Sequence, residues 1–224
     1  MSLFLDRRMR RIFLLGVISG FPWVLIGSSL SLWLKEDGLS RSAVGWAGLI
    51  FAVYAVNFLW APLVDRLRLP YLTDRLGHRK SWILLMQGFI LASLLAWSVL
   101  APSVNITLVI GTGLLIAVCS ATQDITIDAL RIEQIEKEDT AAMAAGASIA
   151  VIGWWSGFKI GGLIALMVAD KFEMMGIVNY WQMTFILLGA IVILCNIGLL
   201  FIPEVGTVER QQAQATAQAS FQQK

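Results

Sequence analysis

Two acidic residues lie inside a long apolar stretch of the sequence, where a charge is costly. Asp124 and Asp128 are four residues apart, so on a helix both side chains lie on one face, and Ser120 extends that face by one turn. A charged side chain at bilayer depth costs about 2.5–3.5 kcal/mol on insertion scales, so each one needs an explanation. Burial disfavours the charged form of a carboxyl group, so the pair marks this face of the helix as a candidate functional site.

Two further polar residues of this segment complete a polar track. Gln123 precedes Asp124, and Arg131 lies three residues beyond Asp128. The alternative for Asp128 and Arg131 is that they form the end of the helix and pair in water. Asp124, one turn deeper, is the stronger functional candidate.

A lysine in a later apolar stretch is the only other charge at comparable depth. Lys159 and Trp155 share a helix with glycines at every fourth position of 153–161, and they fall on the opposite side from those glycines. The glycines predict close approach of another helix. The lysine predicts a wet cavity or a carboxylate partner such as Asp124, unless the true span is shifted and Lys159 lies nearer an interface.

Weaker polar signals come from the first two apolar stretches. Pro22 predicts a bend whose freed backbone carbonyl faces a cavity. Tyr54 and Asn57 are three apart and can share a face. The predicted substrate-binding residues are Lys159, Gln123, Trp155, Tyr54, Asn57 and Ser120.

The segment 65–80 combines acidic residues, a glycine and a basic cluster. Such a set can form charge pairs that join neighbouring helix ends and break when those ends separate. The rule that basic residues stay on the cytoplasmic side explains the cations, but not the aspartates or the glycine. The predicted gating residues are Asp65, Arg66, Asp74, Arg75, Gly77, Arg79, Lys80 and Arg131.

The composition places these residues in a membrane protein. Of 224 residues, 58% are hydrophobic and 14% charged, against about 25% charged in soluble domains, and the mean hydropathy is +0.74. A net charge of +2 does not indicate nucleic-acid binding. Cys119 and Cys195 lie in apolar runs without metal-ligand or disulfide spacing, so we expect no cofactor and no metal.

Six apolar segments are long enough to span a bilayer, and strand periodicity is absent from them. The predicted fold is an all-α bundle of six transmembrane helices. The predicted spans are 12–34, 44–64, 82–101, 106–127, 142–169 and 180–202.

The basic residues predict the orientation. They gather in the N-terminal segment, in alternate loops and after the last span, whereas the other loops carry only Lys35, Arg41 and Lys171. This predicts a multi-pass protein with both termini in the cytoplasm. Four tryptophans fall near span ends, as in an interfacial aromatic belt: Trp33, Trp46, Trp82 and Trp181. We expect a transporter domain over residues 1–203 and a disordered polar tail over 204–224.

Four motifs carry a family resemblance. The stretch 74–80 (DRLGHRK) resembles the loop motif of the major facilitator superfamily, with His78 where a basic residue is usual. The stretches 16–22 (GVISGFP), 60–66 (WAPLVDR) and 119–129 (CSATQDITIDA) look like those of AmpG-type muropeptide permeases within that superfamily.

The resemblance implies a proton-coupled secondary transporter of the bacterial inner membrane, not an enzyme, that imports anhydromuropeptides for peptidoglycan recycling. It implies that Asp124 and Asp128 match the acidic pair of the fourth helix, and it thereby predicts them as proton-coupling residues. Family members often carry an arginine near the position of Trp155, whereas here the cation is Lys159.

Family members also have two six-helix halves, and this chain has the length of one. It is therefore an N-terminal half, a truncated product, or a protein that must dimerise. The expected partners are a muropeptide-like solute, protons, the lipid bilayer and a second half or copy.

Other functions stay open at this stage. An acetyl-CoA-type carrier is an alternative within the superfamily. A Mg²⁺-dependent membrane transferase using Asp124 and Asp128 is an alternative of another class, although a second acidic cluster is lacking on that side of the membrane. A non-transporting membrane scaffold is the third.

Overall fold

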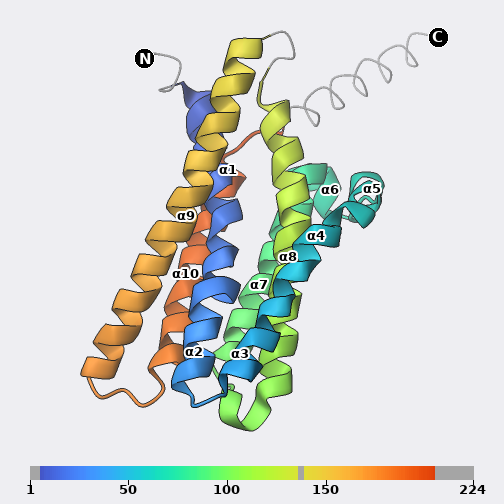
Figure 1. Cartoon of the computed structure of the whole chain (residues 1–224). Coiled ribbons are helices and arrows are strands. Elements are labelled where there is room, and N and C mark those ends of the chain that lie inside the picture. The colour runs from blue at the N-terminus through green and yellow to red at the C-terminus, as the bar shows by residue number, and fades with distance from the viewer. Residues whose placement is uncertain (1–5, 136–138, 205–224) are drawn as a thin grey trace, which may run out of the picture.

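The computed structural model describes residues 6–135 and 139–204. Six helical stretches in these ranges are long and apolar enough to cross a membrane, and they lie side by side in one bundle (Figure 1). The predicted six-helix bundle is thereby confirmed. The six stretches are Arg7–Glu36, Arg41–Leu59, His78–Trp97, Pro102–Glu133, Thr140–Met174 and Tyr180–Leu200. The first, fourth and fifth helices extend beyond the predicted spans at both ends, because their polar ends continue the helix past the apolar residues. The second and third begin and end earlier than predicted, and the sixth ends two residues earlier.

The first crossing is a continuous helix with a widened turn in its middle. It consists of α1 (Arg7–Trp23), the π-helical η2 (Val24–Ser29) and α2 (Leu30–Glu36). Pro22 lies in the last turn of α1, two residues before the π-helical segment begins at Val24. Proline has no N–H and cannot donate to the carbonyl one turn earlier, which accounts for a local change of winding here.

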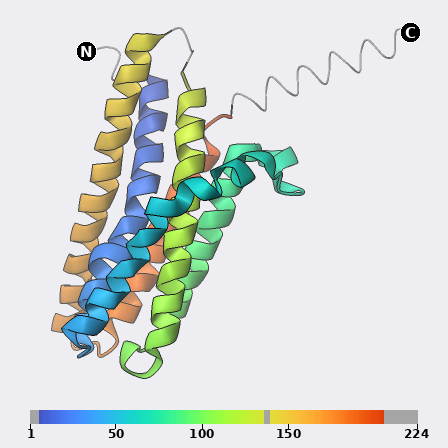
Figure 2. The ribbon, with the colours of Figure 1, turned by 45° about the vertical axis from the view of Figure 1, so that its right-hand side comes forward.

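The second crossing is irregular and lies at the edge of the bundle. Figure 2 shows it running obliquely across the face of α8. Trp46 and Phe58 on this crossing are 69% and 64% exposed, so the described helices leave much of its apolar surface uncovered. It consists of α3 (Arg41–Ala47), η3 (Gly48–Phe51), α4 (Ala52–Val56) and η4 (Asn57–Leu59), and it leads into α5 (Ala61–Arg66) and α6 (Leu72–Leu76).

The remaining four crossings are long α-helices around a core of aromatic side chains, and α8 is kinked near its start at Asn105 (φ −128°, ψ 45°). They are α7 (His78–Trp97), α8 (Pro102–Glu133), α9 (Thr140–Met174) and α10 (Tyr180–Leu200). Trp33 and Trp97 pack against Phe185, with ring centroids 4.9 and 5.0 Å away. Two of the four tryptophans predicted for an interfacial belt, Trp33 and Trp181, are only 2% and 3% exposed, so for these two the prediction was wrong: both rings pack against Phe185 in the interior.

The closest helix contact joins α1 to α9 through glycine. A Cβ atom on Gly16 would lie 2.4 Å from the carbonyl oxygen of Ala150, and one on Gly20 would lie 2.1 Å from that of Trp154. Gly153 and Gly157 face α1 in the same way. The predicted glycine face of the fifth span is confirmed, because only residues without a side chain allow backbones to approach this closely.

Gly157 provides a test of this contact. Its Cβ would lie 2.4 Å from the carbonyl oxygen of Val17, so we expect Gly157→Ala to lower the unfolding temperature in detergent, at a cost of about 1–3 kcal/mol for overpacking. Gly162 is the matched control on the same helix, because its Cβ would meet nothing within 4 Å. Gly162→Ala should unfold at the same or a higher temperature, since alanine favours a helix over glycine by about 1 kcal/mol. An equal loss in both variants would contradict the role of the contact.

Candidate functional site

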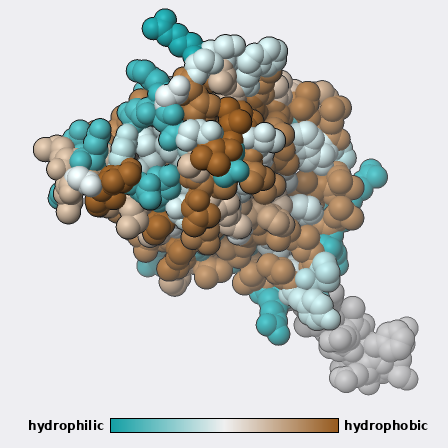
Figure 3. All heavy atoms as spheres, turned by 90° about the horizontal axis from the view of Figure 1, so that it is seen from below, coloured by the Kyte–Doolittle hydropathy of each residue, from teal (hydrophilic) through white to brown (hydrophobic). Residues whose placement is uncertain are grey.

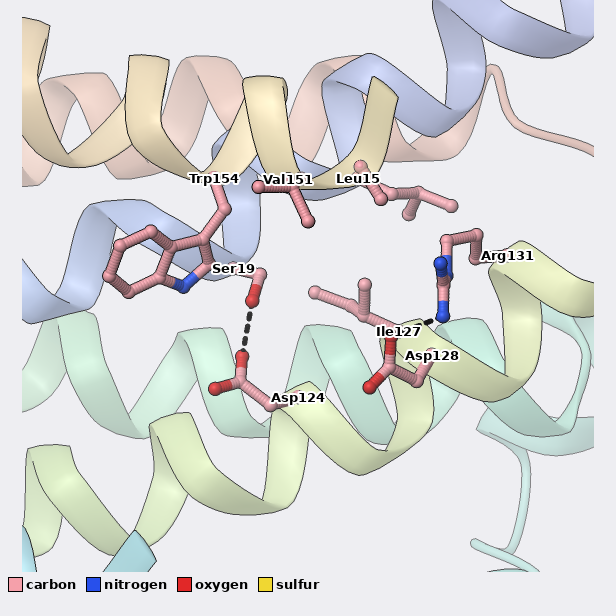
Figure 4. Close-up of a pocket in the computed structure, with 10 residues that line it drawn as sticks. Leu15, Ser19, Asp124, Ile127, Asp128, Arg131, Val151 and Trp154 are labelled. Atoms are coloured by element: carbon pink, nitrogen blue, oxygen red, sulfur yellow. Dashed lines mark hydrogen bonds and ion pairs between the residues drawn. The ribbon is translucent and has the colours of Figure 1, made fainter. Parts of the chain in front are cut away.

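A pocket of about 270 Å³ lies between α1, α8 and α9, toward the end of the bundle where α1 begins and α8 ends (Figures 1 and 4). Its wall combines apolar side chains with three charged groups. It is lined by Leu15, Gly16, Ser19, Asp124, Ile127, Asp128, Arg131, Ala150, Val151 and Trp154. The pocket thus contains both acidic residues that the sequence predicted for proton coupling.

Asp124 is bound to the neighbouring helix by a short hydrogen bond. The hydroxyl of Ser19 on α1 donates to Oδ1 of Asp124 on α8 at 2.6 Å, as the dashed line in Figure 4 shows. In the part of the chain that the structure describes, no basic side chain forms an ion pair with Asp124. Protonation of a half-buried carboxyl group without a cation does not have to break an ion pair.

Asp128 and Arg131 form an ion pair on the same side of the pocket. The guanidinium Nη2 of Arg131 lies 3.1 Å from Oδ1 of Asp128, and the Asp128 side chain is 67% exposed. The pocket therefore reaches solvent at this pair. The alternative interpretation of the two residues, as a paired helix end, agrees with this geometry, and both also line the pocket.

Three polar atoms beside Asp124 lack a hydrogen-bond partner among the described residues. They are the hydroxyl oxygens of Tyr54 and Ser120 and the indole Nε1 of Trp23. The Tyr54 and Trp23 rings are tilted against each other with centroids 4.5 Å apart, Trp23 lies one turn after Ser19 in the first crossing, and Ser120 lies one turn before Asp124 on α8. Buried polar atoms are normally paired, so this group is suited to binding the polar groups of a solute.

Gln123 is occupied by the protein itself. Its Nε2 donates to the carbonyl oxygen of Ile18 at 3.1 Å, and its Oε1 accepts from Nε2 of Gln87 at 2.5 Å. The carbonyl of Ile18 is the group that Pro22 cannot satisfy within α1. The predicted free carbonyl in the first span therefore exists, but Gln123 binds it, so it does not face a cavity. A substrate contact by Gln123 stays a prediction.

Lys159 and Trp155 lie away from this pocket. Lys159 is exposed on α9, with Nζ 5.4 Å from the centroid of the Trp155 ring and 5.5 Å from that of Phe158. Within residues 6–135 and 139–204, Lys159 has no carboxylate partner, so the structure does not pair it with Asp124. The opposite placement of Lys159 and the glycines is as predicted.

Sequence reasoning missed three residues that contact the site. Ser19 donates the hydrogen bond to Asp124. Trp23 has an indole N–H without a partner among the described residues, and Trp154 lines the pocket. The sequence held a signal for Trp154, because this residue follows Gly153 directly and so lies close to the glycine face that predicted a helix contact. The structure places its backbone against Gly20 of α1. Asn57 lies half-buried in η4 and outside this pocket.

A second cluster of charges joins α5, α7 and α8 at the same end of the bundle. The guanidinium of Arg79 pairs with Asp65, and its Nε lies 3.3 Å from Oε1 of Glu133. Gly77, which precedes α7, has a φ of +98°, a conformation that favours glycine and allows the tight turn into the helix. His78 is buried and its Nε2 contacts the carbonyl oxygen of Val64 at 3.0 Å.

Glu204 caps this region from the far end of the chain. Its carboxylate accepts from the backbone N–H of Arg79 at 3.0 Å and of Lys80 at 3.1 Å, which satisfies free donors at the start of α7. The remaining predicted gating residues, Arg66, Asp74 and Arg75, are exposed. Glu204 belongs to the segment predicted as a tail, and the rest of that segment lies outside the described residues.

The site offers little to a metal ion. Across the described ranges, no group of three or more His, Cys, Asp or Glu side chains could hold one, and Asp128 is already paired with Arg131. The acidic pair alone does not provide the set of oxygen ligands that Mg²⁺ uses.

A double substitution tests the structural role of Gln123. We expect Gln123→Leu to destabilise the chain by about 1–3 kcal/mol in a detergent unfolding assay, because the Ile18 carbonyl and the Gln87 amide lose their partner. Pro22→Ala supplies a backbone N–H for that carbonyl. In the Pro22→Ala background the cost of Gln123→Leu should shrink, and an unchanged cost would argue against this bond.

The Arg79 cluster makes a separate prediction. Arg79→Ala should lower the free energy of unfolding by about 1–3 kcal/mol, and with it the unfolding midpoint in detergent. The reason is that two carboxylates lose their charged partner at a partly buried position. Exposed Arg75 is the matched control, and Arg75→Ala should leave the midpoint unchanged. Equal effects of the two substitutions would show that the cluster is not stabilising.

Comparison with known proteins places this geometry in a family. The model of the Major Facilitator Superfamily matches residues 12–223. A protein of Rickettsia felis named as transporter AmpG 4 is 36% identical over 203 residues, which is 91% of this chain and 47% of that protein. The anhydromuropeptide permease of Escherichia coli K12 is 32% identical over 204 residues, which is 91% of this chain and 39% of the permease.

The chain thus spans less than half the length of these relatives. The match to the superfamily covers nearly all of the chain, including five of the six crossing helices in full and the first from residue 12 onward. On this evidence the chain belongs to the major facilitator superfamily, and it is a multi-pass membrane protein.

Proposed function

We propose that the chain forms the N-terminal six-helix half of a proton-coupled importer of anhydromuropeptides in the bacterial inner membrane. The names and similarity of the relatives support the substrate class, and the superfamily supports transport rather than catalysis. Because the chain covers less than half of each relative, a second six-helix unit is needed to complete a transport pathway.

One observation carries the proposal: the hydrogen bond between Ser19 and Asp124 in a pocket that opens to solvent. A charged carboxylate accepts this bond strongly, because hydrogen bonds to ionised groups are about twice as strong as neutral ones. Protonation of Asp124 weakens it. The protonation state therefore changes the strength of the contact between α1 and α8, which is what coupling a proton to a conformational change requires.

The substrate-binding part of the proposal uses two groups of residues. Tyr54, Ser120 and Trp23 present unpaired polar atoms beside Asp124. Lys159 and Trp155 form the second group, on the exposed face of α9. An ammonium beside an aromatic ring suits a solute that carries both carboxylates and sugar rings. Asn57 and Gln123 complete the proposed set.

The second group also supports a partner on α9. Lys159 lies in the middle of Thr140–Met174 and is exposed there, a position where contact with lipid is costly. A second six-helix half, or a second copy of the chain, would cover this face and enclose an aqueous path. The exposed apolar residues of the irregular second crossing are also suited to such contact or to lipid.

The proposed orientation places both termini in the cytoplasm. The Arg79 cluster and the Asp128–Arg131 pair then lie at the cytoplasmic end, where loops of this chain carry most of its basic residues. Breaking of the pairs that Arg79 makes with Asp65 and Glu133 would let α5, α7 and α8 separate, so we propose this cluster as the gate. The proposed transporter domain covers residues 1–203.

Uptake into membrane vesicles tests the proposal. Vesicles from cells without their own muropeptide permease would express the chain, alone or with the part of the E. coli permease that it does not cover. We expect a pH gradient, acid outside, to drive uptake of radiolabelled anhydromuropeptide. Asp124→Asn should reduce this gradient-dependent uptake to the level of empty vesicles, because an amide cannot release a proton.

Asp170 is the matched control. It is an exposed aspartate on α9, and Asp170→Asn should leave uptake unchanged. Undiminished coupled uptake by Asp124→Asn would refute the role of Asp124. Absence of uptake by the unsubstituted chain in both settings would refute the proposed function.

A further inference from the structure

A second and larger pocket lies at the opposite end of the bundle from Asp124. Its volume is about 630 Å³, and it is formed where the first crossing turns into the second. Figure 3 views this end of the molecule and shows hydrophilic side chains set among hydrophobic ones. The pocket is lined by Ser28, Ser31, Leu32, Lys35, Leu39, Arg41 and Val44.

The charge of this pocket is entirely positive. Lys35 and Arg41 line it, and no acidic side chain does. Among the described residues neither cation forms an ion pair. The sequence carries few basic residues on this side of the membrane, so the presence of two of them in one pocket is unusual for the chain.

The acidic residues next to Lys35 are occupied elsewhere. Glu36 accepts hydrogen bonds from the hydroxyl of Tyr180 at 2.8 Å and from Nε1 of Trp181 at 2.6 Å. Asp37 accepts from the backbone N–H of Ser103 at 2.5 Å. These bonds fasten the turn to α10 and α8, and they direct both carboxylates to partners outside the pocket. The two cations are thus left without a neutralising group.

The rest of the wall is suited to an anion attached to a carbon skeleton. Ser31 adds a hydroxyl that can donate a hydrogen bond, whereas the hydroxyl of Ser28 donates to the carbonyl of Val24 at 3.1 Å. Leu32, Leu39 and Val44 supply apolar surface.

We propose that this pocket binds an oxyanion, a carboxylate or phosphate group borne by a partly apolar molecule. Arg41 would hold two oxygens through its planar guanidinium, and Lys35 would add a compact charge. The group can come from a solute that carries carboxylates or from the headgroup of an anionic lipid. The site goes beyond the transport function proposed above and does not depend on it.

Binding to the purified chain in nanodiscs tests the site in two arms. In neutral phosphatidylcholine discs, a fluorescent tripeptide with two carboxylates is titrated and followed by anisotropy. We expect the double substitution Lys35→Gln and Arg41→Gln to weaken binding about tenfold or more. The amidated tripeptide should not bind, and added salt should weaken binding by the intact chain.

The second arm uses discs that contain phosphatidylglycerol and measures, by mass spectrometry, the lipid that the chain retains after delipidation. We expect the intact chain to retain phosphatidylglycerol and the double variant to lose it. Lys171→Gln is the matched control. Lys171 is an exposed basic residue near the end of α9, at the same end of the bundle as this pocket. It lines neither this pocket nor the one at Asp124.

A dependence on Lys35 and Arg41, but not on Lys171, in either arm supports the site, and the arm in which it occurs identifies the source of the anion. Equal results for the intact chain and the double variant in both arms overturn the proposal. So does a loss in Lys171→Gln as large as that in the double variant. Neither readout requires transport, so failure of muropeptide uptake and failure of this site are distinguishable.

Discussion

The contact between the backbones of α1 and α9 is the constraint on which the rest of the bundle depends. Gly16 meets Gly153, Gly20 meets the backbone of Trp154 and Gly157 meets that of Val17, so no side chain fits at these glycines. The contact fixes where Ser19 stands relative to α8 and where Trp154 stands relative to α1, so the pocket is a consequence of it. Since a lipid bilayer offers no hydrophobic driving force between helices, such close packing is what holds them together.

A second constraint is that buried polar groups need partners where water is scarce. Pro22 removes a donor from α1, and Gln123 on α8 replaces it at the carbonyl of Ile18. A polar side chain inside the membrane therefore compensates for a proline on a neighbouring helix. Against this background the unpaired atoms of Tyr54 and Ser120 stand out, because they lie near Asp124, a half-buried carboxyl group that forms no ion pair among the described residues. The satisfied part of the network is structural, and the unsatisfied part is where a solute can bind.

Much of the fold followed from local patterns in the sequence. Apolar stretches of the right length predicted six crossings, and the four-residue spacing of Gly153 and Gly157 predicted a close helix contact. The face shared by Asp124 and Asp128 was also readable, because helical spacing decides it. The partners of those residues were not readable: Ser19 lies 105 positions away from Asp124, and no pattern within one helix shows which helix will pack against it. For the same reason Trp33 was mistaken for an interfacial residue, since its burial depends on Phe185 of the last helix.

The distances along the chain also bear on the order of assembly. The main neighbour of α1 is α9, which begins more than a hundred residues later at Thr140. During synthesis the first helix is thus inserted long before its principal partner exists. Its glycine face and the carbonyl of Ile18 therefore have no partner from this chain until α8 and α9 have been synthesised and inserted. Contacts of such long range form late, so the pocket that contains Asp124 is completed only near the end of translation of this six-helix unit.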